Sequence, residues 1–406
     1  MESPPASVLL PSSGASAPGT NREGDWRIRF DRNELAGAFG DIGTDLPLLV
    51  GVMLAARMDA AGALIMFGTM QILTGLRYRM PMPVQPLKAM AAIVIAHQVD
   101  ASVLAGGALA IGVAMLVLAL TGCVDWVSRA VPKAVVRGIQ FGLGLQLVTL
   151  ALGKYVAEGG ATGYALASVG LVIVFALTGN RRYPAALAVV GLGTVYAAVF
   201  TLDARAVLGG IGLRLPQPHF PSFPDIVSGF VVLALPQLPL SLGNSILATR
   251  QLSRDLFPDR APTVRAISLT YAAMNLLNPM FGGVPTCHGS GGMAGHYAFG
   301  GRTGGSVILY GGFFLATGLF LSAGFHELAN AFPLPLLGVL LVVEGLTLMA
   351  LVRDLLEDSR ELFVALLVGS IAVTVPYGYI VALVAGTALS RLPASELRSG
   401  RALDTR

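Results

Sequence analysis

The sequence predicts an all-α integral membrane protein with 14 transmembrane segments arranged as a 7+7 inverted repeat. Hydrophobic residues make up 54% of its 406 residues and charged residues only 12%. Soluble domains carry roughly 25% charged residues, so this chain has too little charge to cover a surface that faces water. Its 50 glycines and 24 prolines are typical of a protein with membrane helices, some of them broken.

The apolar segments follow one another along the chain, many of them close to the about 20 residues that a spanning helix needs. The third and the tenth are too short to cross as full helices, and Pro376 and Gly378 divide the last apolar block in two. The expected segments are 34–55, 60–76, 85–97, 102–121, 134–152, 163–179, 184–200, 226–247, 266–281, 288–299, 304–323, 335–352, 362–375 and 376–391.

Positive charges predict the orientation. With a cytoplasmic N-terminus, the outer loops hold only Arg57, Lys154, Arg205 and Arg214, which is a positive-inside bias. Both termini are then cytoplasmic, and we expect a multi-pass protein of the plasma (inner) membrane. The inner loops hold Arg77, Arg79, Arg129, Lys133, Arg181, Arg182, Arg250, Arg254, Arg260, Arg265, Arg302, Arg353 and Arg360.

The terminal segments and the two cysteines indicate no binding site. Residues 1–30 are predicted to form a disordered cytoplasmic tail, and 392–406 a second cytoplasmic tail. Cys123 and Cys287 stand in no metal-binding or disulfide pattern, so we expect no metal and no cofactor. The net charge of +4 comes without a basic run interleaved with aromatics, so nucleic acid is not an expected partner.

Weak internal matches divide the chain into halves, 31–200 and 226–391, joined by a linker at 201–225. Asp45-Leu-Pro-Leu resembles Gln237-Leu-Pro-Leu, and Met90 and Met293 end similar segments 203 residues apart. Seven segments per half give the halves opposite orientations. Inverted-repeat transporters bind their substrate near the midplane, where interrupted helices of both halves meet.

The first such segment contains Pro81, Pro83 and Pro86, which predict a short extended stretch followed by a half-helix. Lys88 falls in the first turn of that helix, where a cation opposes the helix dipole and an anion would relieve the conflict. A lysine that snorkels to the membrane surface is the alternative. Gln85 precedes it in the extended stretch.

The second segment, Gly282–Gly292, contains five glycines that permit a concavity lined by backbone N–H groups. Ser290 adds a hydroxyl and His288 a group that titrates near neutral pH. A glycine-rich packing seam is the alternative. Gly289 and Gly291 flank Ser290 at the expected start of a half-helix.

Ionisable residues within the expected segments are further candidates. Asp41 and Asp45 share one helix face, and Asp45 has the stronger case because its counterpart in the repeat, Gln237, is also polar. Asp41 could instead cap a helix or pair with an arginine. Glu344 could bind protons or pair with Arg137. Weaker candidates are Gln140, Gln146 and Asn244, and no role is expected for His97, His219 and His326.

Three motifs, GAFGDIGTDLPL, MPMPVQPLKAMAA and GGVPTCHGSGGMAGHYAFGGRTGG, resemble the molybdate transporter family related to sulfate permeases, without the STAS domain of those permeases. The resemblance spans about residues 31 to 390. It implies a core domain of segments 1–4 and 8–11, a gate domain of segments 5–7 and 12–14, and elevator-type alternating access. Matched by motif, the binding residues are Asp45, Gln85, Lys88, His288, Gly289, Ser290 and Gly291, and the repeat adds Gln237.

The implied function is import of molybdate by proton symport, with Asp45, Glu344 and His288 as candidate proton carriers. Sulfate or tungstate are alternative substrates, and the expected partners are protons, membrane lipid and, as an option, a second copy of the chain in a homodimer. A nucleobase–proton symporter would need carboxylates where Gln237 and Ser290 stand. An intramembrane serine hydrolase is prompted by His288-Gly-Ser-Gly, but no enzyme activity is expected.

Overall fold

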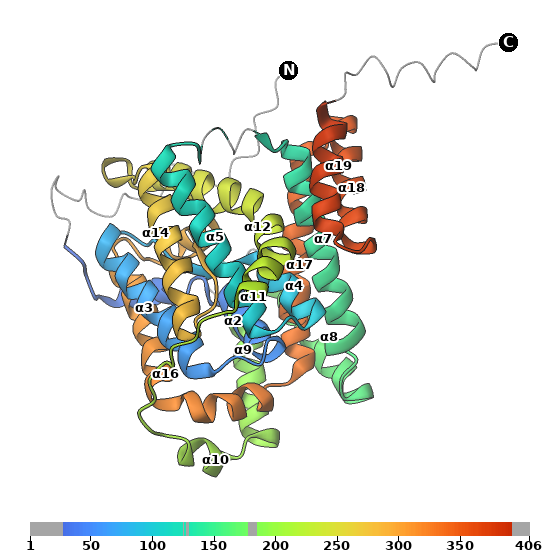
Figure 1. Cartoon of the computed structure of the whole chain (residues 1–406). Coiled ribbons are helices and arrows are strands. Elements are labelled where there is room, and N and C mark those ends of the chain that lie inside the picture. Colours follow the sequence, from blue (N-terminus) through green and yellow to red (C-terminus); the bar gives the residue numbers. More distant parts are fainter. Residues whose placement is uncertain (1–26, 125, 127–129, 178–184, 392–406) are drawn as a thin grey trace, which may run out of the picture.

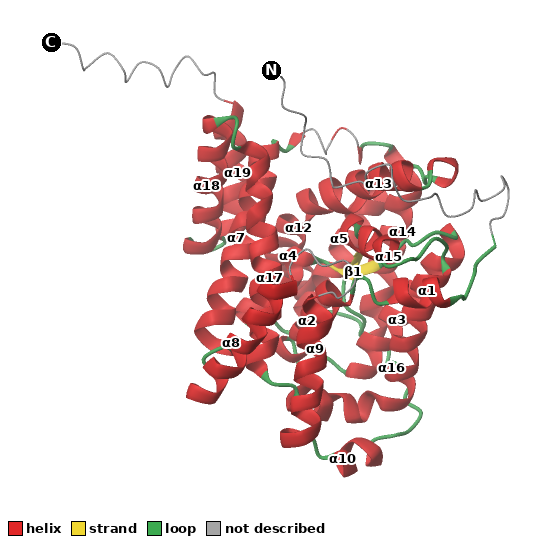
Figure 2. Cartoon of the chain, turned by 180° about the vertical axis from the view of Figure 1, so that it is seen from behind, coloured by secondary structure: helices red, strands yellow, loops and turns green. Residues whose placement is uncertain are grey.

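The computed structural model describes residues 27–124, 126, 130–177 and 185–391. Most of these residues are helical, and two three-residue strands lie in the middle of the molecule (Figure 2). The elements of the first half are α1 (Arg32–Ala38), α2 (Ile42–Ala55), α3 (Ala60–Tyr78), β1 (Val84–Pro86), α4 (Lys88–His97), α5 (Ala101–Thr121), α7 (Lys133–Leu150), α8 (Gly160–Leu177) and α9 (Ala185–Tyr196).

The second half begins after the short helix α10 (Ala204–Gly209), which lies within the expected linker. Its elements are α11 (Phe223–Gly229), α12 (Leu235–Leu240), α13 (Thr249–Leu256), α14 (Val264–Leu277), β2 (Thr286–His288), α15 (Ser290–Ala298), α16 (Gly305–Ala331), α17 (Leu334–Ala350), α18 (Ser359–Thr374) and α19 (Gly378–Arg391).

Within the described residues, seven helices are long and apolar enough to cross a membrane, or eight if α1 and α2, bent by 43°, form one span. The longest runs without a break from Phe223 to Leu256, through α11, α12, α13 and the π-helical turns between them. A helix overlaps every apolar segment expected from the sequence, but several are short. The protein is therefore a multi-pass membrane protein.

The third and tenth apolar segments form short helices, as their length predicts. Helix α4 has ten residues and α15 has nine, and each follows a three-residue strand. The prolines before α4 remove backbone donors, and the glycines before α15 weaken a helix, so neither segment continues as helix towards its N-terminus. These are the broken segments that the sequence predicts.

The two strands pair with each other although they lie about 200 residues apart. β1 and β2 are antiparallel, with Gln85 opposite Cys287 and Val84 opposite His288. This pairing leads α4 and α15 away in opposite directions, so that the N-termini of the two helices lie close together in the middle of the fold.

Side-chain amides satisfy the outer edges of this small sheet. Gln71 of α3 donates to the Val84 oxygen (2.8 Å) and accepts from the Val84 nitrogen (3.0 Å). Asn275 of α14 does the same for Thr286, at 2.6 and 3.0 Å. Non-helical backbone at membrane depth must find hydrogen-bond partners within the protein, and these two amides provide them.

The longer helices form two groups around the central elements (Figure 1). In one group α3 packs on α16 and α5 packs on α14 and α11; in the other α7 packs on α17 and α18, and α18 on α19. Glycines allow the closest approaches: a Cβ added at Gly68 of α3 would lie 2.5 Å from the Gly311 oxygen of α16. Helices α2, α4 and α12 lie between the groups.

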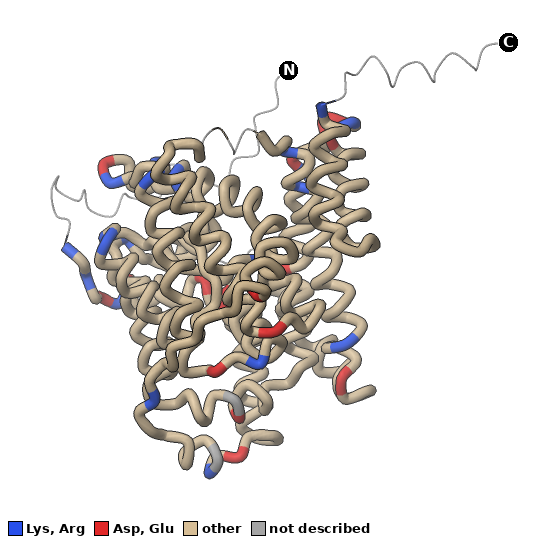
Figure 3. The backbone as a smooth tube through the Cα atoms, viewed as in Figure 1, with Lys and Arg blue, Asp and Glu red and all other residues tan. Residues whose placement is uncertain are grey.

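Lysine and arginine gather at one end of the molecule (Figure 3). The cluster includes the end of α13 and the loop before α14, and the end with α10 carries fewer. The predicted tails at 1–26 and 392–406, and Arg129, Arg181 and Arg182, lie outside the described residues.

Candidate functional site

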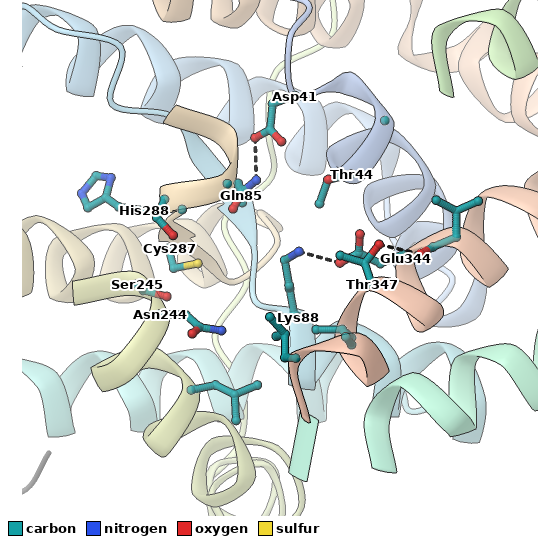
Figure 4. A pocket seen from close by; sticks show the side chains of 18 of the residues that line it. Asp41, Thr44, Gln85, Lys88, Asn244, Ser245, Cys287, His288, Glu344 and Thr347 are labelled. Atoms are coloured by element: carbon teal, nitrogen blue, oxygen red, sulfur yellow. Dashed lines mark hydrogen bonds and ion pairs between the residues drawn. The ribbon is translucent and has the colours of Figure 1, made fainter. Parts of the chain in front are cut away.

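A cavity of about 430 Å³ lies where the strand pair meets the N-termini of α4 and α15. Its polar wall comes from four separate parts of the chain: the bend before α2, the first half-helix segment, the region after α12 and the second half-helix segment, with α17 closing the remaining side (Figure 4). The polar residues that line it are Asp41, Thr44, Gln85, Lys88, Gln237, Asn244, Ser245, Cys287, His288, Ser290, Glu344 and Thr347.

Lys88 projects into this cavity from the first residue of α4. Its Nζ lies 2.5 Å from Oε1 of Glu344 on α17, so the pair joins the half-helix α4 to the helix group that contains α7 and α17. Of the two alternatives for Glu344, the pairing with Arg137 is wrong, because Arg137 contacts Asp354, in the turn after α17, and Gln140 on its own helix. Glu344 lies on the cavity side of α17 and out of that network.

Gln237 caps the N-terminus of α4. Its Oε1 accepts from the backbone nitrogens of Ala89 (2.8 Å) and Met90 (3.3 Å), and its Nε2 donates to Ser241 (3.0 Å). Two of the N–H groups at the start of α4 are thus already occupied. Gln237 lines the cavity and also fixes the half-helix in place.

The N-cap residue of α15 is Gly289, and it makes no side-chain capping hydrogen bond. Gly289, Ser290 and Gly291 all line the cavity. A Cβ at Gly289 would lie 1.6 Å from Oε1 of Gln85, so a larger residue here would have to displace the Gln85 side chain. The first turn of α15 therefore presents backbone and a hydroxyl to the cavity, an arrangement suited to an anion.

Asp41 lies against this same turn. Its Oδ2 accepts from Nε2 of Gln85 at 2.6 Å, and a Cβ at Gly292 would lie 2.1 Å from that oxygen. Asp41 occupies the N-cap position of α2 but its side chain makes no capping hydrogen bond there. Asp41 therefore stands at the helix cap, but its carboxylate lines the cavity and does not cap the helix.

Asp45 and His288 are placed differently from the other predicted residues. Asp45 is fully buried, does not line the cavity, and neither of its oxygens has a hydrogen-bond partner within the described part of the chain. His288 turns its ring away from the cavity (Figure 4), towards Thr270 (2.7 Å) and the Pro83 oxygen (3.2 Å). Its backbone belongs to β2 at the cavity wall.

The sequence ranked Asn244 as a weak candidate and did not indicate Ser245 or Cys287, yet these three residues form one wall of the cavity. Asn244 and Ser245 direct their polar groups into it, as does the thiol of Cys287 (Figure 4). The stripe Gln237, Ser241 and Asn244 has helical spacing and could have revealed the first of these. Nothing in the sequence around Cys287 indicates that its side chain faces a cavity, because that depends on which face of β2 is turned inward.

A lysine-bearing cavity at the facing ends of two half-helices, enclosed in an apolar helical chain, defines a multi-pass membrane transporter of the kind that binds anions. A sequence model described as "Molybdate transporter of MFS superfamily" matches residues 33–147 and 229–348, more than half of the chain. The chain belongs to this molybdate transporter family.

Relatives and solved structures agree with that assignment. Molybdate transporter 2 of Arabidopsis thaliana is 32% identical over 392 residues, covering 84% of this chain and 83% of that protein. Molybdate transporter 1 of the same plant is 31% identical with the same coverage. The transmembrane domain of the cyanobacterial bicarbonate transporter BicA aligns with a TM-score of 0.63 at 16% identity, over 90% of this chain and 98% of that one, which shows the fold.

Proposed function

We propose that this protein imports molybdate, a tetrahedral dianion, by proton symport, and that the anion binds in the cavity beside Lys88. The observation that carries the proposal is the position of this cationic side chain, which faces the N-terminus of α15 across the cavity. The family of molybdate transporters to which the chain belongs supports the choice of anion.

The energetics require several groups to act together. Burying a bare dianion would cost tens of kcal/mol, whereas one helix N-terminus contributes at most about 2 kcal/mol. Lys88 supplies a full charge, Gln85 an amide, and Ser290 with the backbone of Gly289 and Gly291 the remaining donors. Charge-assisted hydrogen bonds are roughly twice as strong as neutral ones, which favours a dianion in this setting.

The membrane potential is the reason for proposing proton coupling. Moving a dianion into a cell that is negative inside by 100 mV costs about 4.6 kcal/mol, at about 2.3 kcal/mol per charge. Two co-transported protons would cancel that cost. The cavity contains carboxylates able to carry them.

For the architecture we propose 14 segments in a 7+7 inverted repeat, with both termini cytoplasmic and the group around α3 and α16 as a core that moves against a gate around α7 and α17. Three features support it: the antiparallel pair β1–β2 with one strand from each half, the matched amides Gln71 and Asn275, and the ion pair of Lys88 on α4 with Glu344 on α17.

The test is binding and uptake by purified protein. We expect molybdate to bind, and Lys88→Ala to weaken binding by about 10- to 100-fold, because a hydrogen bond to a charged group contributes about 1.5–3 kcal/mol. The exposed Lys154→Ala is the matched control and should bind as the wild type does. Tungstate and sulfate, titrated in parallel, establish the preferred oxyanion; unchanged affinity in Lys88→Ala would rule out this site.

A further inference from the structure

The cavity already contains two carboxylates that occupy groups an anion would need. Asp41 accepts from the amide of Gln85 at 2.6 Å and lies against the first turn of α15. Glu344 accepts from Nζ of Lys88 at 2.5 Å. Figure 4 shows the two pairs on neighbouring sides of the same cavity, with the amide and the ammonium group both directed into it.

The charge of the lining makes these carboxylates competitors of the substrate. Among the described residues that line the cavity, Asp41, Glu344 and Lys88 are the charged ones, and Cys287 and His288 are the other titratable ones. With both carboxylates ionised the lining has a net charge of minus one, which repels a dianion strongly where water is scarce. Two added protons change that net charge to plus one.

We propose that Asp41 and Glu344 are the two proton-binding groups of the transport cycle, each ionised in the empty cavity and protonated when the oxyanion replaces it on Gln85 or Lys88. This assignment rests on the proposed function and identifies its coupling residues. Once protonated, each carboxyl can donate its O–H to the bound oxyanion, so the two protons also become part of the binding site. No bond is broken; two protons from solution accompany one dianion.

The geometry favours Asp41 and Glu344 as the proton-binding groups over Asp45, His288 and Cys287. Asp45 lies behind the cavity wall, fully buried, and would have to change its surroundings to meet the substrate. Both ring nitrogens of His288 have partners outside the cavity, Thr270 and Pro83. Cys287 would be uncharged as a thiol and add no repulsion. Asp41 and Glu344 are the carboxylates that touch the groups on which an anion would bind.

Binding measured against pH tests the proposal without any transport assay. Linkage requires the affinity for molybdate to fall by up to about 100-fold per pH unit where two protons are taken up, and by about tenfold where one is. We expect the steeper slope for the wild type, the shallower one for Asp41→Asn and for Glu344→Gln, and no slope for the double variant. At alkaline pH both variants should bind more tightly than the wild type, because a competing charge is gone.

Whether the variants bind molybdate more tightly or more weakly than the wild type at alkaline pH distinguishes proton coupling from a purely structural role of the two carboxylates. If the two carboxylates only hold the fold together, neutralising them weakens binding at every pH and leaves its pH slope unchanged. Glu357→Gln, an exposed acid after α17, is the control and should behave as the wild type does. The wild-type slope remains decisive if a variant does not fold, since a pH-independent wild-type affinity overturns the proposal.

Uptake into proteoliposomes provides an independent test, because its dependence on the membrane potential reports the net charge moved per transport cycle. With two protons per dianion the wild type moves no net charge, so a potential set by valinomycin and potassium should leave molybdate accumulation unchanged. Each single variant should move one net negative charge and accumulate about 50-fold less at 100 mV negative inside, from about 2.3 kcal/mol per charge.

Different results would contradict molybdate transport and the assignment of proton binding to Asp41 and Glu344. Wild-type protein that neither binds nor transports molybdate contradicts the proposed function. Wild-type protein that transports molybdate, with Asp41→Asn and Glu344→Gln as insensitive to voltage as itself, contradicts only the assignment of these residues. The same voltage response appearing in Asp45→Asn in their place would assign the coupling to Asp45.

Discussion

At the scale of single residues, the cavity is organised by contacts between neighbouring polar groups more than by isolated charges. Gln237 holds the start of α4, Gln85 connects Asp41 to the start of α15, and Lys88 is held by Glu344. Gln85 and Lys88, two of the proposed ligands, therefore already have protein partners in the absence of substrate. An incoming anion must replace such partners, so small steric changes near them should affect binding strongly.

Gly289 offers the sharpest steric test. Its backbone has φ −122°, which any residue adopts, yet a Cβ there would lie 1.6 Å from Oε1 of Gln85. We expect Gly289→Ala to displace that amide from Asp41 and to weaken molybdate binding at least about tenfold, for a loss of about 1.4 kcal/mol. Binding titration checks this.

Gly191→Ala is the matched control, because a Cβ there meets nothing within 4 Å. Wild-type affinity in Gly289→Ala would mean that Gln85 adapts without cost and does not help to bind the anion.

At the scale of elements, the unusual feature is a two-stranded sheet inside an otherwise helical membrane protein. Three residues per strand bring too few hydrogen bonds to be stable alone. Gln71 and Asn275 complete the pattern from neighbouring helices, at corresponding positions of the two halves. The sheet then fixes the separation of the two half-helix N-termini, so its stability determines the shape of the cavity.

Replacing either amide with leucine should destabilise the protein. Gln71→Leu leaves the nitrogen and oxygen of Val84 without the partners seen here, and Asn275→Leu does the same for Thr286. Each buried unpaired group costs about 1–3 kcal/mol, so each variant should lose at least about 2 kcal/mol. Thermal unfolding in detergent measures the loss, and molybdate binding should weaken with it.

The control is Gln217→Leu, whose side chain is exposed. An unfolding midpoint in Gln71→Leu equal to that of the control would show that water replaces the lost amide and that the strand pair does not depend on it.

At the scale of the whole molecule, two helix groups lie around the central cavity, and the ion pair of Lys88 with Glu344 joins α4, which lies between the groups, to α17. The basic residues gather at one end (Figure 3), and the positive-inside rule predicts that this end is the cytoplasmic face. Relative movement of the groups would expose the cavity to one side and then the other, provided that alternate loops lie on opposite sides of the membrane.

Labelling of single cysteines tests that topology. Cys123 is exposed after α5, and Glu158 is exposed before α8, with one long helix, α7 and its π-helical end, between them. In a Cys287→Ser background, an impermeant maleimide should label Cys123 only from the cytoplasmic side. With Cys123→Ser added, a cysteine in Glu158→Cys should be labelled only from outside. Labelling of both from one side would contradict the proposed arrangement.

The sequence predicted much of the fold because the membrane imposes strong local rules. Apolar length gave the helical segments, and the prolines near Lys88 and the glycines around Ser290 gave the broken ones. It also brought Gln85, Lys88, Gln237 and the start of α15 into one expected site, all of which line the cavity. These features depend on neighbours along the chain.

Only the tertiary structure decided which groups face each other. The sequence favoured Asp45 over Asp41, because the counterpart of Asp45 in the repeat, Gln237, is polar. In the structure Asp41 lines the cavity, whereas Asp45 is fully buried and does not line it. Glu344 pairs with Lys88, some 250 residues away, in place of Arg137. The sequence by itself determined an apolar helical chain with two broken segments. Long-range packing, which no local pattern encodes, decided that two carboxylates, Asp41 and Glu344, line the cavity in which we propose that the anion binds.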